Sequence, residues 1–131
     1  MAQDSFMKGM VQALANMPDE QRKTMLTDKV RSFVNMEENE RIAAMRSMLV
    51  AALDLPEEKY MNIAKTRTVA VMSLHQDEME TLMKSHIQIV MALEQDQKNK
   101  EMMAMKSIVM SLPNQQRENL KKMLSNLGMT L

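Results

Sequence analysis

The sequence has no cysteine and no tryptophan, and its 131 residues include only one tyrosine and two phenylalanines. Without cysteine the chain has no disulfide, no thiolate metal site and no cysteine nucleophile. Three aromatic side chains cannot form the stacking platform on which single-stranded nucleic acid binds. The 17 basic and 17 acidic side chains balance, so the charge gives no basic footprint for nucleic acid. We therefore expect no nucleic-acid partner.

Turn residues and long apolar runs are also scarce. Two glycines and three prolines are fewer than a β-rich fold or a long-loop enzyme normally uses, and helix formers dominate instead. No stretch approaches the roughly 20 apolar residues of a membrane span. Residues 1–16 lack the apolar core of a signal peptide. The composition therefore predicts an all-α, soluble, cytoplasmic protein without a membrane span.

A short phrase recurs along the chain, and its clearest copy is Leu55-Pro56-Glu57-Glu58. Its first apolar residue recurs with a constant 19-residue period, at Met17, Met36, Leu55, Leu74, Leu93 and Leu112. Proline suits a first helical turn, and acidic residues there suit the helix dipole. Each copy is therefore expected to begin a helix. The residues just before the copies are mostly N-cap types, and we expect them to cap: Asn16, Asn35, Asp54, Ser73, Ala92 and Ser111.

The repeat divides the chain into helices of similar length. We expect one α-helical repeat domain over residues 1–131, with helices at about 3–15, 18–34, 37–53, 56–72, 75–91, 94–110 and 113–127. Apolar residues recur at helical spacing within these ranges. The connections between them are short, so neighbouring helices are predicted to run antiparallel and to pack side by side.

A second, 38-residue period connects alternate helices. Met7-Lys8-Gly9-Met10, Met45-Arg46-Ser47-Met48 and Met83-Lys84-Ser85-His86 share one pattern at that interval. The unit is then a two-helix hairpin, which stacks because one hairpin cannot bury its apolar face alone. This unit resembles helical-repeat solenoids, such as HEAT-type arrays or the helical cytoplasmic domain of some magnesium transporters. The resemblance implies only an architecture, a small right-handed solenoid or a superhelical bundle.

Methionine is abundant, with 19 copies. Met7 with Met10, Met45 with Met48, and Met83 with His86 each lie on one helix face, and stacked hairpins place these pairs in a row. Met-rich surfaces adapt to apolar partners. We interpret the row as a groove for an amphipathic helix or an apolar segment of a protein partner. Three basic residues, Lys8, Arg46 and Lys84, are expected at its rim, where they favour specificity.

The resulting hypothesis is a non-enzymatic protein-interaction or scaffold domain, with a homodimer through an apolar end left open. Flexible core packing is the structural alternative for methionine. A second functional alternative is a Cu(I) site, because thioethers and imidazole suit that ion; its ligands would be Met79, Met83 and His86. A third is a carrier of a small apolar ligand between the helices. No catalytic motif is visible, so we expect neither an enzyme nor a cofactor.

Overall fold

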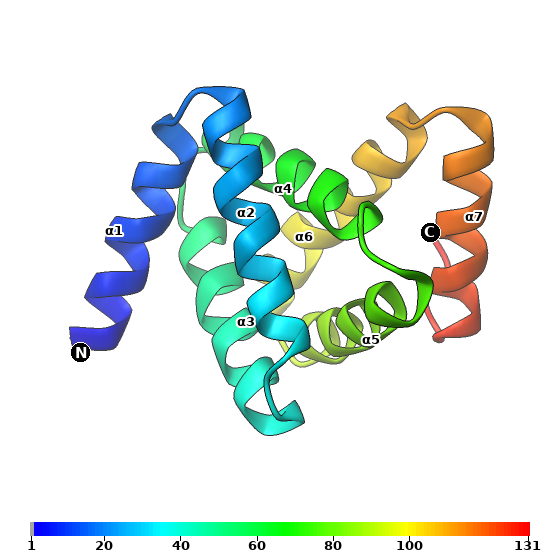
Figure 1. The fold of residues 1–131 in the computed structure, drawn as a ribbon, viewed down its shortest axis with the longest axis horizontal. Coiled ribbons are helices and arrows are strands. Elements are labelled where there is room, and N and C mark those ends of the chain that lie inside the picture. The colour runs from blue at the N-terminus through cyan, green and yellow to red at the C-terminus, as the bar shows by residue number, and fades with distance from the viewer. Residues whose placement is uncertain (1) are drawn as a thin grey trace.

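The structure, a computed structural model, describes residues 2–131 and the side chains of residues 5–131. It contains seven α-helices and no strand over that range, which confirms the all-α prediction. The helices are α1 (Ala2–Asn16), α2 (Asp19–Val34), α3 (Glu38–Leu53), α4 (Glu57–Met72), α5 (Gln76–Met91), α6 (Gln95–Ser111) and α7 (Asn114–Asn126). In Figure 1, α1 and α7 lie at opposite sides of the molecule with the other helices between them.

The connections between helices share one geometry. The recurring apolar residue donates its backbone N–H to the carbonyl three positions earlier, as in Leu55 to Ala52 at 3.0 Å and Leu74 to Val71 at 3.1 Å. The following residue is extended, for example Pro56 with φ −54° and ψ 149°. Its carbonyl then accepts the first helical hydrogen bond, from Tyr60 N–H at 2.9 Å. Each helix from α2 onward consequently begins one position later than the sequence suggested.

The predicted N-caps are wrong. The N-caps of α2 to α7 are Pro18, Glu37, Pro56, His75, Glu94 and Pro113. Asn35, Asp54, Ser73 and Ala92 are instead C-caps of the preceding helices, and Asn16 and Ser111 are the last residues of α1 and α6. The cause is the tight turn, because the N–H groups of these C-cap residues bond back to the helix before them.

The prediction that neighbouring helices pack side by side is also wrong in its main feature. The most extensive contacts join helices two apart in the chain, namely α2 with α4, α1 with α3 and α3 with α5. Consecutive helices touch less. Figure 1 shows why, since consecutive helices such as α6 and α7 diverge from the turn that joins them. From α1 to α5 the main contacts are therefore between alternate helices, whereas α7 packs mainly against α6.

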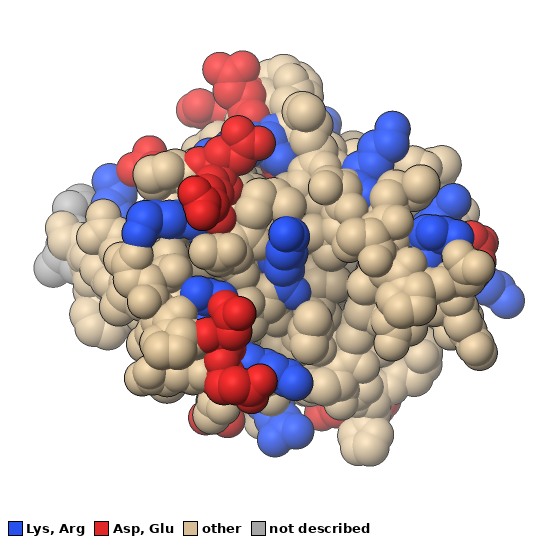
Figure 2. Space-filling view, turned by 90° about the horizontal axis from the view of Figure 1, so that it is seen from above, with Lys and Arg blue, Asp and Glu red and all other residues tan. Residues whose placement is uncertain are grey.

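The core consists of aliphatic and methionine side chains, together with the one tyrosine and Phe33. Leu55, Leu74 and Leu93 are buried, so these connections are anchored by apolar side chains as well as by hydrogen bonds. Phe6, by contrast, is 71% exposed. In residues 2–131 we find no helix with the length and hydrophobicity needed to cross a membrane. On the face in Figure 2, basic and acidic side chains are interspersed.

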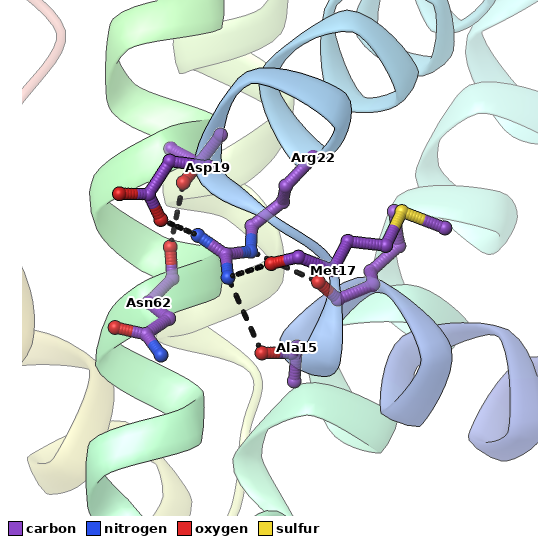
Figure 3. A network of polar contacts seen from close by, with 7 residues as sticks. Ala15, Met17, Asp19, Arg22 and Asn62 are labelled. Atoms are coloured by element: carbon purple, nitrogen blue, oxygen red, sulfur yellow. Dashed lines mark hydrogen bonds and ion pairs between the residues drawn. The ribbon is translucent and has the colours of Figure 1, made fainter.

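Arg22 bonds the carbonyl end of the helix before it (Figure 3). It lies in α2 and is only 4% exposed. Its Nε donates to Leu14 O at 2.9 Å, and its Nη2 donates to Met17 O at 2.7 Å and to Ala15 O at 3.3 Å. Asp19 accepts from Nη1 at 2.9 Å. One guanidinium thereby donates to two carbonyls in the last turn of α1, where intrahelical donors are lacking, and to the carbonyl of Met17 in the connection. Leu14 O also accepts from the N–H of Met17 at 3.2 Å.

The same role recurs at two other connections. Arg41, 19 residues after Arg22, donates to Phe33 O at 3.2 Å and to Met36 O at 3.0 Å. The residue a further 19 positions along the chain is Tyr60, which has no guanidinium to donate. There Lys100 of α6 donates to Leu53 O at 2.6 Å and Leu55 O at 3.2 Å. The carbonyl end of α3 is thus held by a distant helix.

We predict that Arg22→Ala lowers the free energy of unfolding by about 2 to 3 kcal/mol, because buried carbonyls lose charged donors. Arg117 occupies the equivalent place in α7 but bonds only Asn114 Oδ1 and Glu118. Arg117→Ala should therefore change stability by less than about 0.5 kcal/mol. Urea denaturation of both variants measures the difference. Equal losses would contradict the role assigned to Arg22.

Candidate functional site

A cavity lies at the centre of the helices. It offers about 90 Å³ to the centres of water-sized molecules, which is room for several waters. Residues of α2 to α7 line it, and all but three are apolar. The apolar lining residues are Leu26, Val30, Phe33, Met45, Met48, Leu49, Ala52, Ile63, Val71, Met72, Leu82, Met83, Met105, Ile108, Val109, Leu120 and Leu124.

The three polar lining residues are Arg67, Thr68 and His86. Thr68 is already satisfied, because its hydroxyl donates to Ala64 O within α4 at 2.9 Å. Arg67 from α4 and His86 from α5 therefore form the polar wall of the cavity. Both belong to a larger buried cluster behind that wall.

Glu101 of α6 is the centre of this cluster, and it has no exposed surface. Arg67 Nη2 donates to Glu101 Oε2 at 3.0 Å, and His86 Nε2 lies 2.5 Å from the same oxygen. The hydroxyl of Tyr60, a buried residue of α4, donates to Glu101 Oε1. A buried carboxylate is costly unless it is paired and hydrogen-bonded, and here α4 and α5 supply its partners.

Burial shifts the ionisation of Glu101, Arg67 and His86. It raises the pKa of the Glu101 carboxyl to about 8 and lowers the pKa of Arg67 to about 10. Burial, with the nearby charge of Arg67 adding to it, lowers the pKa of His86 to about 3. The imidazole of His86 is therefore neutral at pH 7, and Arg67 is the one lining residue that carries a charge.

Part of the Arg67 guanidinium is not engaged. Among residues 5–131, its one hydrogen bond uses Nη2. In the same part of the chain, no fully buried side-chain nitrogen or oxygen lacks a hydrogen-bond partner. Nε and Nη1 must therefore retain accessible surface, in agreement with the 20% exposure of the side chain. Arg67, which lines the apolar cavity, thus has two donor nitrogens that make no hydrogen bond within residues 5–131.

The predicted methionine row is divided by the fold. Met45, Met48, Met83 and His86 line the central cavity, whereas Met7 and Met10 on α1 do not. Met7, Met48 and His86 are buried, and Met10, Met45 and Met83 are half-buried. The three predicted rim residues, Lys8, Arg46 and Lys84, are exposed. The row therefore faces inward over most of its length.

The residues of the alternative Cu(I) site lie on α5 in different surroundings. Met83 and His86 line the central cavity, but Met79 lines a separate cleft. The Nε2 atom of His86 is already 2.5 Å from Glu101, which leaves Nδ1 as its other ring nitrogen. No group of three or more His, Asp or Glu side chains in residues 5–131 could hold a metal ion. A thioether site stays a prediction.

That separate cleft lies between α5 and α7. It offers about 630 Å³ to the centres of water-sized molecules. Met72, Met79, Leu120, Met123 and Leu127 supply its apolar lining, and Gln76, Glu80, Gln116, Asn119, Lys122 and Asn126 supply polar groups. It marks a break in the packing, because the contacts between α5 and α7 are fewer than those between the other helices two apart.

Sequence reasoning missed the roles of Tyr60, Arg67 and Glu101. A signal for Glu101 was present, because it falls on the same helical stripe as Ala104, Met105 and Ile108. A charged residue on an apolar stripe needs a buried partner. The repeat gives a second signal, since the equivalent positions hold Met25, Ala44, Ile63, Leu82 and Leu120.

Comparisons with protein-family models, with curated proteins and with solved structures give no match for this chain. The resemblance to HEAT-type arrays therefore stays an expectation.

We predict that His86→Gln, which can keep an N–H donor toward Glu101, changes how stability depends on pH. The folded-state pKa of His86, about 3, lies below the value of about 6.5 for an unfolded histidine. The unfolded state therefore binds more protons as pH falls through about 6.5, and the free energy of unfolding decreases. Glu101, with its raised pKa, acts in the opposite direction in both proteins.

Between pH 7 and pH 5, the wild type should lose up to about 2 kcal/mol of stability relative to His86→Gln. Urea denaturation at the two pH values measures this difference. Parallel pH dependence of the two proteins would mean that His86 is not held neutral in the fold.

Proposed function

We propose that this chain is a non-enzymatic binding domain for a small, largely apolar molecule, which occupies the central cavity. The observation that supports the proposal is the apolar lining contributed by six helices, with Arg67 and His86 at one wall. A mostly apolar cavity with a few convergent polar groups is the usual form of a ligand site. Glu101 and Tyr60 do not line the cavity, so the buried cluster orients Arg67 and His86 rather than reaching a ligand.

The methionines support this proposal. Met45, Met48, Met72, Met83 and Met105 all contact the cavity. Methionine has three rotatable side-chain bonds and a polarisable sulfur, so it reshapes around an apolar guest. This gives three members of the predicted row, Met45, Met48 and Met83, a role inside the molecule as part of an adaptable wall. It also supplies a local probe for binding, because each methionine methyl group gives its own NMR signal.

Benzene should bind inside the protein and perturb a defined set of methionines. In protein labelled at the methionine methyl carbons, we expect titration to shift the signals of Met45, Met48, Met83 and Met105. Three methionines that are more than half exposed and do not line the cavity should keep their signals in place: Met91, Met103 and Met110. A six-atom ligand gains at most about 9 kcal/mol, which sets the tightest dissociation constant at about 0.2 µM, so the titration should run from micromolar concentrations to the solubility limit of benzene.

A matched pair of variants controls this experiment. Ala52 lines the cavity and is 2% exposed, so Ala52→Leu fills part of the space and should abolish the shifts. Ala43 on the same helix is exposed, and Ala43→Leu should leave them unchanged. Shifts confined to Met91, Met103 and Met110, or no shifts up to the solubility limit of benzene, would refute a ligand-binding cavity.

A protein partner is the second candidate function, and the cleft between α5 and α7 favours it. Its apolar lining and polar rim suit an apolar helix or segment better than the buried methionine row does. The candidate binding site for a protein partner is then the cleft between α5 and α7 and not the predicted methionine row.

The double substitution Met45→Glu with Met48→Glu tests whether the row is a surface. We expect loss of a cooperative thermal transition, because two carboxylates would enter a packed region, at a cost of at least about 4 kcal/mol. The exposed residues Arg46 and Lys84 provide the control, since their replacement by glutamate should change stability by less than about 0.5 kcal/mol each. Circular dichroism melting measures all three proteins. An unchanged melt of the methionine double variant would restore the groove hypothesis.

We also propose that the chain is a repeat of a 19-residue, one-helix unit, paired into a 38-residue unit. The support is that α2 to α7 begin at Asp19, Glu38, Glu57, Gln76, Gln95 and Asn114. The preference for contacts between helices two apart agrees with the longer period.

A further inference from the structure

The charge on the cavity wall indicates which end of a ligand the cavity prefers. Arg67 is the one charged residue among those that line it, and Glu101 is not part of the lining. The lining residues of α2, α3, α6 and α7 are all uncharged and apolar. A molecule in the cavity therefore meets hydrocarbon on most sides and a single cation at one wall. Complementarity favours an apolar body with one anionic end.

The hydrogen bonds of Arg67 leave room for that end. Glu101 engages Nη2 alone, whereas Nε and Nη1 keep accessible surface. A guanidinium binds a carboxylate best through two parallel N–H donors. Nε and Nη1 lie on different edges of the guanidinium and cannot hold one carboxylate as a parallel pair. Each of them can still donate a single hydrogen bond to a carboxylate oxygen. The position of Arg67 is fixed by its hydrogen bond to Glu101, so little ordering cost remains for binding.

From these contacts we propose that the ligand is a small apolar carboxylic acid, whose carboxylate pairs with Arg67 and whose hydrocarbon part lies against the cavity methionines. This inference rests on the ligand-binding function proposed above. Water and neutral ligands can also accept from Arg67, but only an anion adds a charge interaction at a wall that is surrounded mainly by hydrocarbon.

The titratable groups around Arg67 allow a ligand carboxylate to bind there in addition to the carboxyl group of Glu101. Tyr60 on α4, His86 on α5 and Glu101 on α6 are the titratable side chains in its cluster, and Lys100 lies over the Tyr60 ring at 5.2 Å. His86 is neutral at pH 7 because its pKa is lowered. The raised pKa of Glu101 lets it hold a proton near neutral pH, so two negative charges need not coexist beside Arg67.

Three six-carbon probes that differ only in their polar end test the inference, namely hexanoate, hexan-1-ol and hexan-1-amine. In calorimetric titrations of the full chain at pH 7, we expect hexanoate to bind at least tenfold more tightly than hexan-1-ol. The amine, which would place a cation against Arg67, should bind more weakly than the alcohol. The preference for hexanoate should persist in 0.5 M NaCl, because a buried pair is screened far less than surface charges.

Arg67→Gln should remove the advantage of hexanoate while changing the affinity for hexan-1-ol by less than threefold. Arg46→Gln, at an exposed arginine of α3, should change neither. If Arg67→Gln does not fold, the wild-type series and its salt dependence decide the matter alone. Methionine methyl shifts at Met45, Met48 and Met83 confirm that each probe occupies the cavity.

The outcomes separate the two proposals. Binding of hexan-1-ol in the cavity with no preference for hexanoate, or a preference that disappears in salt, would overturn the carboxylate inference and leave the binding function standing. Absence of cavity binding by all three probes and by benzene would overturn the binding function itself.

Discussion

The backbone carbonyls at the helix ends are the constraint on which the other features depend. Short connections leave these carbonyls unpaired beside the next helix. The repeated apolar residue donates its own N–H to one of them. Arg22 and Arg41 donate to that same carbonyl and to further ones, and Lys100 donates to the carbonyls of Leu53 and Leu55. Such tight turns fix how each helix leaves the last. Consecutive helices therefore diverge, and alternate helices supply the main packing surfaces.

Packing of diverging helices leaves irregular space at the centre, and this chain has few large rigid side chains to fill it. One tyrosine, two phenylalanines and no tryptophan give methionine the task of filling gaps, which its flexibility suits. The space that remains is the cavity lined by α2 to α7. The many methionines and the cavity thus have the same cause, which is irregular space between diverging helices in a chain with few large rigid side chains.

The sequence predicted helices well because its signals are local. The period of Leu55, Leu74 and Leu93 reports a connection geometry that recurs along the chain, whereas the N-caps were misassigned because polar residues such as Asp54 suit either end of a turn. The angle between consecutive helices at each turn decides which helices pack together. The pattern of side chains in the sequence does not predict that angle. The cluster around Glu101 was missed because its partners come from other helices that are distant in the chain.

The place of Arg67 and His86 in the repeat argues for a role beyond packing. They are 19 residues apart, and the positions at the same spacing in α1, α3, α6 and α7 hold Met10, Met48, Met105 and Leu124. In α2 this position holds Lys29, whose ammonium lies over the Phe33 ring instead. A buried ion pair is often no more stabilising than apolar residues of similar volume. Methionine or leucine at the positions of Arg67 and His86, with an apolar residue in place of Glu101, would pack without charge. Stability alone therefore does not explain a polar wall that faces a cavity, and this supports the proposal that a ligand binds there.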